Sequence, residues 1–316
     1  MQKKKITTIG GGSGQFTLLS ALRDIKGIEI SSIVSMVDSG GSTGRLRDEF
    51  GILPPGDILK CLLALSPKRE YARKILQTRF KNSKKLKGHN AGNMLLGFLS
   101  QYTGNFPEGV EALGEILGIR GHVLPVTIDR ATLVAELSNG ERIFGEAAID
   151  VPRGTQREKI VKTFLVPHHA SEIKIYDPVI LAIKKADFII VGPGDIYTSI
   201  IPNFLVPGVK EALQKSGAKI IYITNIMTKF GESDSFEVED FVGLIHKTLG
   251  KKVDIVLQNN NKPNEDILKK YKKQKAFYVQ TSKNNKYKEE DLLDISDEII
   301  RHDKQKLARA LEKIII

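Results

Sequence analysis

The stretch KITTIGGGSGQFTLLSAL (residues 5–22) decides the fold of this 316-residue chain. The β-branched run 5–9 predicts a strand, the glycines after it predict a tight turn, and the segment from about Gln15 to Ile25 predicts a helix. Glycines at a strand-to-helix turn let the backbone approach a phosphate, and the helix N-terminus supplies N–H groups. The turn lacks the Lys-Ser/Thr of a Walker loop and the third glycine of the dinucleotide fingerprint. A tight turn without a ligand is the alternative, and the candidate phosphate contacts are Gly11, Gly12, Ser13 and Gly14.

A second glycine loop, DSGGSTGR (38–45), follows the next predicted strand, SSIVSMV (31–37). Asp38 stands where Rossmann-type proteins hydrogen-bond a ribose hydroxyl. A guanidinium group is a bidentate partner for phosphate, so this loop suits a second oxyanion contact. A surface turn capped by Asp38 is the alternative reading. The candidates here are Asp38, Gly40, Gly41, Ser42 and Arg45.

Further loops place glycine, amide or hydroxyl groups at predicted helix starts or strand ends: LPPGD (53–57), GHNAGN (88–93), VGPGDIYTS (191–199) and NIMT (225–228). Asp57 is equally well placed as the N-cap of its helix, and a lone histidine such as His89 is more often structural. Because the carboxyl ends of parallel strands meet at one sheet edge, we expect the strand-end loops to converge on one ligand site. The candidate residues are Gly56, Asp57, His89, Asn90, Asn93, Gly192, Gly194, Tyr197, Thr198, Ser199 and Asn225.

Short apolar strands that alternate with helical segments predict an α/β fold with a Rossmann-like parallel sheet flanked by helices. The stretch 121–170 differs, because compact strand signals around the hairpin turn Asn139-Gly140 predict an antiparallel β insertion. The strands expected there are VLPVTI (123–128), ATLVAEL (131–137), ERIFGEAAI (141–149) and IVKTFLV (160–166). A later strand is expected at AFYVQ (276–280). Since there is no long linker or repeat, a single domain over 1–316 is preferred to two.

The chain is basic, and its net charge of +11 is concentrated in residues 3–5, 79–88, 269–275 and 283–288. These runs lack the interleaved aromatics of a base-stacking surface, so nucleic-acid binding is not the expected function. A basic approach to a phosphate site is an alternative. No stretch approaches the roughly 20 apolar residues of a membrane span, and the start lacks the apolar run of a signal peptide. With one cysteine, Cys61, in an apolar run, we expect a cytoplasmic location and no disulfide.

The motif segments follow one another along nearly the whole chain: GGGSGQFTLLSAL (10–22), VDSGGSTGRLRDEFGILPPGDILKCLLALS (37–66), GHNAGNMLLGFL (88–99), VGPGDIYTSIIPNFLVPGV (191–209) and YITNIMTKFGESD (222–234). Their combination resembles the gluconeogenesis factor family, the UDP-sugar-binding branch of the 2-phospho-L-lactate transferase (CofD-like) superfamily. The resemblance implies a cytoplasmic regulatory protein that binds a nucleotide sugar such as UDP-N-acetylglucosamine. It also implies links to cell shape, cell-wall synthesis and gluconeogenic growth, with regulatory or wall-synthesis proteins as partners and a homodimer by analogy.

The related transferases move a phospholactyl group from a guanosine diphosphate carrier with the help of Mg2+, and that activity is the alternative function. The family usually has two aspartates before its second glycine loop, whereas Asp38-Ser39 is one carboxylate short. Mg2+ prefers carboxylate oxygens, so we expect no resident metal or other cofactor and assign no catalytic residue. Tyr271 and Arg301 match family positions at the sugar-nucleotide site, where they would stack on uracil and bind phosphate. A tyrosine on an amphipathic helix and a surface arginine are the alternatives.

Overall fold

The computed structural model describes residues 3–40, 52–67, 69–81, 86–168 and 171–316. Its main element is a seven-stranded sheet with the order β10-β9-β8-β7-β1-β2-β3, in which all neighbouring strands are parallel. The strands are β1 (Lys4–Gly10), β2 (Ile28–Val34), β3 (His122–Pro125), β7 (Phe188–Val191), β8 (Lys219–Ile223), β9 (Ile255–Asn259) and β10 (Lys288–Glu290). The predicted Rossmann-like parallel sheet is therefore confirmed.

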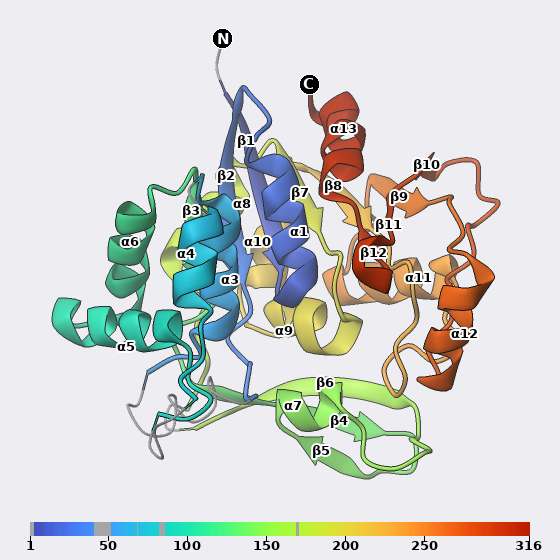
Figure 1. Cartoon of the computed structure of the whole chain (residues 1–316), viewed down its shortest axis with the longest axis horizontal. Helices are drawn as coiled ribbons and strands as arrows, with labels where there is room; N and C mark the ends of the chain where they lie inside the picture. Colours follow the sequence, from blue (N-terminus) through green and yellow to red (C-terminus); the bar gives the residue numbers. More distant parts are fainter. Residues whose placement is uncertain (1–2, 41–51, 68, 82–85, 169–170) are drawn as a thin grey trace.

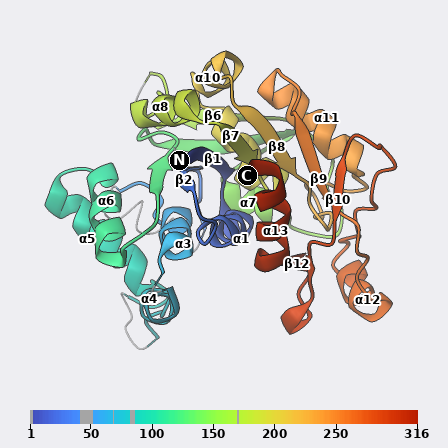
Figure 2. The ribbon, with the colours of Figure 1, turned by 90° about the horizontal axis from the view of Figure 1, so that it is seen from above.

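Helices cover both faces of this sheet (Figure 2). Along one face lie α1 (Gly12–Leu22), α3 (Gly56–Leu65) and α13 (Lys304–Ile315), and along the other lie α8 (Asp177–Lys185), α10 (Val209–Lys215) and α11 (Val238–Leu249). Strands covered on both faces read as continuous apolar runs, and residues 6–10 of β1 are all buried. The remaining helices are α4 (Arg69–Leu76), α5 (Ala91–Thr103), α6 (Phe106–Leu117), α9 (Ile201–Phe204) and α12 (Glu265–Lys273), with a π-helical turn η1 (Ile196–Ile200) and a 3₁₀ turn η2 (Ser296–Glu298).

A smaller antiparallel sheet faces the carboxyl ends of the main strands and forms a layer of its own in Figure 1. It consists of β4 (Ala131–Leu137), β5 (Arg142–Phe144) and β6 (Ile160–Pro167) in the order β5-β4-β6, with the short helix α7 (Glu146–Asp150) beside it. It lies within the predicted 121–170 insertion, which is thereby confirmed as antiparallel. A two-stranded ribbon, β11 (Leu293–Asp294) and β12 (Arg301–His302), precedes the last helix.

Some predicted strands are wrong. Segment 123–128 does not join the antiparallel insertion: β3 pairs in parallel with β2 and forms an edge of the main sheet. The run 141–149 is a strand only to Phe144, because Gly145 turns with φ +92° and α7 begins at Glu146. The segment 276–280 forms an isolated bridge between Tyr278 and Met227, not a strand. A short apolar run shows the same sequence pattern in a parallel edge strand, in an antiparallel strand and in an isolated bridge. Its partners in the tertiary structure decide which of these it forms.

One hydrophobic core cluster includes residues of the main sheet, its helices and the antiparallel sheet. Cys61 is fully buried in α3. Among the described residues, no helix has both the length and the apolar composition needed to cross a bilayer.

Candidate functional site

The first glycine loop joins β1 to α1, and an aspartate from another helix, α3, accepts a hydrogen bond from it. The backbone N–H of Gly12 donates to Oδ2 of Asp57 at 2.8 Å, and Nζ of Lys60 donates to Oδ1 of the same carboxylate at 2.8 Å. The N-cap of α3 is Pro55, so Asp57 does not cap its own helix as one alternative had it. Instead, Asp57 caps α1, and a carboxylate is favoured there by the helix dipole.

The next two N–H groups of the same helix end are not used in this way. Within the described part of the chain, the backbone N–H groups of Ser13 and Gly14 have no hydrogen-bond acceptor. The side chain of Ser13 is exposed. The first turn of α1 therefore presents backbone donors that an anion could accept.

Other segments of the protein pack closely against two of these glycines. A Cβ on Gly14 would lie 2.1 Å from the carbonyl oxygen of Pro193, and a Cβ on Gly11 would lie 2.8 Å from the Asp57 carboxylate. The Pro193 carbonyl belongs to the backbone, so only glycine fits at position 14, whereas a Cβ at position 11 would require the Asp57 side chain to move. The loop after β1 and the loop after β7 therefore touch, as expected for strand-end loops of one parallel sheet.

The loop 192–199 after β7 is held from both sides. Nδ2 of Asn225, just after β8, donates to the carbonyl of Gly194 at 3.0 Å. Tyr197 and Thr198 are buried in η1, where the Tyr197 N–H and the Thr198 hydroxyl donate to Glu232 at 3.0 and 3.1 Å. Ser199 is half-buried, and its Oγ is the nearest atom to a Cβ built on Gly12. The side chains of Tyr197 and Thr198 thus have protein partners, and their contact with a ligand stays a prediction.

The second glycine loop is described only as far as Gly40, so the predicted Gly41, Ser42 and Arg45 lie outside the described residues. Asp38 accepts from the Gly40 N–H at 2.9 Å, which makes a tight turn. The neighbouring Ser39 N–H donates to Glu146 at 3.4 Å, and the Ser39 hydroxyl accepts from the backbone of α7 at 3.1 Å. Burial raises the pKa of Glu146 to about 8, and the negative charge of Asp38 contributes. Sequence reasoning missed Glu146, which brings a carboxyl group close to the position where the usual second aspartate is missing.

The fourth loop begins α5 and caps that helix, and the contact of its residues with a ligand stays a prediction. Oδ1 of Asn90 accepts from the Asn93 N–H at 2.6 Å, which is an N-cap. His89 and Asn93 are buried. Gly92 packs closely on Leu59, because a Cβ there would lie 2.5 Å from the leucine side chain. This contact brings the start of α5 beside α3, whose first turn carries Gly56 and Asp57.

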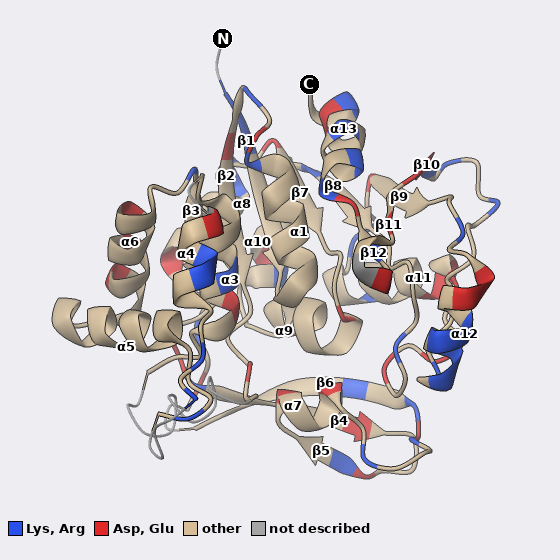
Figure 3. Cartoon of the chain, in the orientation of Figure 1, with Lys and Arg blue, Asp and Glu red and all other residues tan. Residues whose placement is uncertain are grey.

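Tyr271 and Arg301 belong to elements that contact the segment just after β8. Tyr271 of α12 packs in a small apolar cluster with Ile226, and its hydroxyl accepts from the Ile300 N–H at 2.8 Å. Arg301 is exposed on β12, and the neighbouring His302 hydrogen-bonds the backbone of Thr224. Figure 3 shows basic residues along α12. The structure therefore places both residues at the same sheet edge as the strand-end loops.

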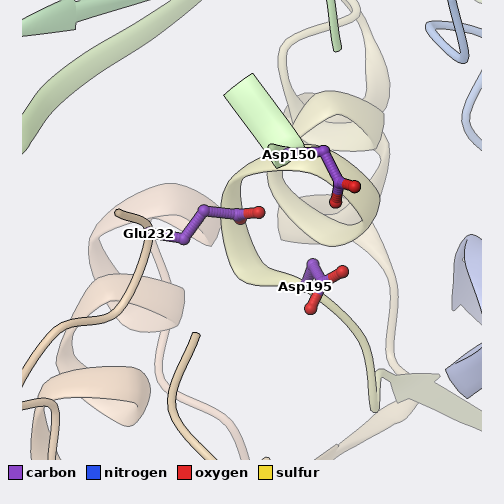
Figure 4. Close-up of side chains that lie close together, drawn as sticks. All are labelled: Asp150, Asp195 and Glu232. Atoms are coloured by element: carbon purple, nitrogen blue, oxygen red, sulfur yellow. The ribbon is translucent and has the colours of Figure 1, made fainter. Parts of the chain in front are cut away.

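A lysine-centred ionic cluster was not predicted at all. Figure 4 shows the carboxylates of Asp150, Asp195 and Glu232 facing one another, and their oxygens lie within 4.8 Å of one another. Nζ of Lys229 lies 2.7 Å from Oδ2 of Asp195 and 3.2 Å from Oε1 of Glu232, and it also pairs with Asp150. Burial alone would lower the pKa of Lys229, but the carboxylates outweigh it and raise that pKa. The ammonium group already supplies the positive charge that a metal ion would bring to these acids.

Known proteins of similar sequence identify the family to which these loops belong. A family model described as 2-phospho-L-lactate transferase CofD matches residues 6–300. The chain belongs to the CofD family. This agrees with the resemblance that its motif segments indicate.

Several relatives of this CofD-family chain are named gluconeogenesis factor. A Thermotoga maritima protein with that name is 40% identical over 319 residues, which cover 98% of this chain and 99% of the relative. The Bacillus subtilis gluconeogenesis factor is 36% identical over 321 residues, which cover 99% of each chain. A crystal structure of a Bacillus halodurans protein superposes with a TM-score of 0.91 at 34% identity, over 98% of this chain and 99% of that one. The similarity therefore spans the main sheet and the antiparallel layer together.

Proposed function

We propose that this CofD-family protein binds a nucleotide sugar of the UDP-N-acetylglucosamine type at the carboxyl edge of its parallel sheet and acts as a regulator. The observation that carries the proposal is the first turn of α1. There, the N–H groups of Ser13 and Gly14 have no acceptor among the described residues, while the loop after β7 packs against the same turn. A helix N-terminus with unused donors at the carboxyl end of a central parallel strand favours a phosphate-bearing ligand.

The rest of the ligand would extend along the same edge. The diphosphate would lie over Gly11–Gly14 and the second glycine loop, with Asp38 on the ribose or base. The loop 192–199 and Asn225 would enclose the sugar end. Oδ1 of Asn225 supports this layout, because it is buried and has no hydrogen-bond partner in the described part of the chain.

The outer end of the site would be formed by the C-terminal elements. Tyr271 would stack on the base and Arg301 would bind phosphate. Tyr271 packs in the apolar cluster with Ile226, just after β8, and Arg301 follows Ile300 of the same cluster in the chain. An anionic ligand also suits a chain with a net charge of +11. The basic residues of α12 supply local positive charge on this side.

The transferase activity of related proteins is the second candidate, and it depends on Mg2+. The carboxylates available for that ion are Asp38, Asp57 and Glu146. They do not fit it well, since both oxygens of Asp57 are already bound by Gly12 and Lys60. Burial also raises the pKa of Glu146 to about 8, which favours its neutral form at neutral pH. We therefore place binding and regulation before metal-assisted transfer.

The cellular part of the proposal rests on family membership. Relatives are named gluconeogenesis factor, and we propose a role in gluconeogenic growth together with cell shape and cell-wall synthesis. Protein partners in these processes would bind to the ligand-bound state of this protein. A homodimer is proposed by analogy with the family. A cytoplasmic location is in keeping with the buried, unpaired Cys61.

Isothermal titration calorimetry tests the ligand. The purified protein would be titrated with UDP-N-acetylglucosamine and, separately, with GDP in the presence of Mg2+. We expect saturable binding of the UDP-sugar that does not depend on the metal and that weakens at least about tenfold in Arg301→Ala. Arg309→Ala is the matched control, because Arg309 is exposed on α13 and carries the same charge.

Two results would count against the proposal. Tight Mg2+-dependent binding of GDP without a response to the UDP-sugar would favour the transferase. Equal weakening in Arg301→Ala and Arg309→Ala would mean that only the overall charge matters, and that Arg301 does not bind phosphate directly.

A further inference from the structure

Lys229 lies where three separate parts of the chain meet. Its Nζ contacts Asp195 at 2.7 Å and Glu232 at 3.2 Å, and it pairs with Asp150. Asp195 immediately precedes η1 in the loop 192–199, and Asp150 is the last residue of α7. Glu232 follows β8 and is fully buried at its side chain.

Glu232 connects this ionic cluster to the backbone of η1. Its two carboxylate oxygens accept from the Tyr197 N–H at 3.0 Å and from the Thr198 hydroxyl at 3.1 Å. The Tyr197 hydroxyl also reaches the carbonyl of Ile160 in β6 at 3.3 Å. The loop after β7 is thus attached to Lys229 through Asp195 and Glu232, and to the antiparallel sheet through Tyr197.

Helix α7 is held at both of its ends. At its start, Glu146 accepts from the Ser39 N–H, and Ser39 accepts from the Ala147 N–H, so that end is fixed to the second glycine loop. At its other end, Asp150 is fixed to Lys229. This short helix therefore spans the distance between two loops that the proposed function assigns to the ligand.

The attachment of α7 to the loop 192–199 depends on the positive charge of Lys229. Three carboxylates contact the ammonium group of Lys229, and Glu232, which has no exposed surface at its side chain, also interacts with the charge of Arg157. Without the ammonium, Asp150 and Asp195 would have no cation between them and would repel one another. The end of α7 and η1 would then separate, because Asp150 and Asp195 belong to different segments.

We propose that Lys229 is a positioning residue that fixes α7 to the loop 192–199, and that it thereby sets the spacing between this loop and residues 38–40. Lys229 itself does not contact the ligand in this arrangement. The effect on ligand affinity rests on the proposed function, whereas the fixed spacing is a property of the unliganded protein.

Hydrogen–deuterium exchange of the unliganded protein tests the spacing directly. In Lys229→Met, we expect the amides of 146–150 and 196–200 to exchange at least about tenfold faster, and Lys229→Arg should restore most of the protection. Lys313→Met is the matched control, because Lys313 lies on α13, away from this cluster, and its loss removes an ion pair with Glu290 of β10. Unchanged exchange of both segments in Lys229→Met would overturn the proposal.

Asp150→Asn gives a second route if Lys229→Met fails to fold. It should release 146–150 and leave 196–200 protected, because Glu232 still holds η1. Release of both segments to the same extent would contradict the arrangement.

Calorimetry with UDP-N-acetylglucosamine separates this inference from the proposed function. Affinity should fall at least about tenfold in Lys229→Met and recover in Lys229→Arg. Faster exchange with unchanged affinity would overturn the claim that the spacing governs binding. If the wild-type protein does not bind this UDP-sugar, the proposed function fails, and the exchange measurements still decide the positioning role of Lys229.

Discussion

The carboxylate of Asp57 on α3 accepts a hydrogen bond from the backbone N–H of Gly12 at the start of α1, at 2.8 Å. The cap of the first helix therefore comes from a residue that is 45 positions away in the sequence. The same carboxylate binds Lys60. Asp57 thus fixes α3 to the glycine loop and leaves the next N–H groups of α1 available.

Replacing this cap should weaken the fold. Asp57→Ala should lower the free energy of unfolding by about 1–2 kcal/mol, the usual cost of losing a helix cap. Asp57→Asn should cost less, since its amide oxygen can still accept from Gly12. Urea unfolding followed by circular dichroism would measure both. Lys60→Met is the control, and its effect should stay below about 1 kcal/mol because the lysine side chain is partly exposed. A larger loss in Lys60→Met than in Asp57→Ala would contradict the capping role.

The contact between Gly14 and Pro193 predicts a steric cost. In Gly14→Ala, the new Cβ would lie 2.1 Å from the carbonyl oxygen of Pro193, so the two loops must move apart. We expect the free energy of unfolding to fall by about 1–3 kcal/mol, as for other overpacked sites. Gly217→Ala is the matched control, because nothing lies within 4 Å of a Cβ there. Equal thermal stability of the two variants would show that the loops do not touch in solution.

A negative charge at Ser13 should block the ligand without harming the fold. Ser13 is exposed in the first turn of α1, where an aspartate is favoured by the helix dipole. Ser13→Asp should therefore keep the melting temperature of the wild type and weaken UDP-N-acetylglucosamine binding at least about tenfold. Ser13→Ala retains the backbone donors and should change the affinity by less than about threefold. Wild-type affinity in Ser13→Asp would exclude this turn as the phosphate site.

Glu146 should make stability depend on pH. Burial raises the pKa of Glu146 to about 8, with a further contribution from Asp38. In the unfolded chain the group titrates near about 4.3, so between these values the folded state holds the proton more firmly. The free energy of unfolding should therefore fall as the pH rises from about 5 to about 8, and the stabilisation is fully present only below the unfolded pKa.

Comparing variants isolates this effect. In Glu146→Gln the fall between those pH values should be smaller than in the wild type, because the amide cannot ionise. Glu312→Gln, an exposed change on α13, should keep the full fall. Urea titrations at each pH would measure it, and an identical pH profile for wild type and Glu146→Gln would remove Glu146 as the source.

The sequence was informative where the signal is local. The β-branched run 5–9 and the apolar run 31–37 predict two strands of a parallel sheet, and the structure pairs β1 with β2. Strand-end loops were expected at one edge, and Gly14 does lie against Pro193. The pattern could not show, however, that Pro193 packs on Gly14 and that the Asp57 carboxylate of α3 lies beside Gly11.

Contacts between distant segments could not be predicted from local patterns. Ser39 and Glu146 are 107 positions apart, and no sequence motif around either residue indicates that the two are in contact. Lys229 and Glu232 lie in the motif segment 222–234, just after a predicted strand end. Their partner Asp150 comes from the antiparallel insertion, and no local pattern links the two segments. The predicted Tyr197 and Thr198 are buried by the same network, because Glu232 accepts from both.

The first strand and the first helix of this chain are both completed by segments synthesised much later. β1 lies between β2 and β7, and α1 packs against α13. α1 is covered in part by α3, which follows it closely in the chain, but its contact with α13 can form only after residues 304–315 have left the ribosome. Long-range contacts of this kind slow folding and leave unfinished chains more exposed to aggregation.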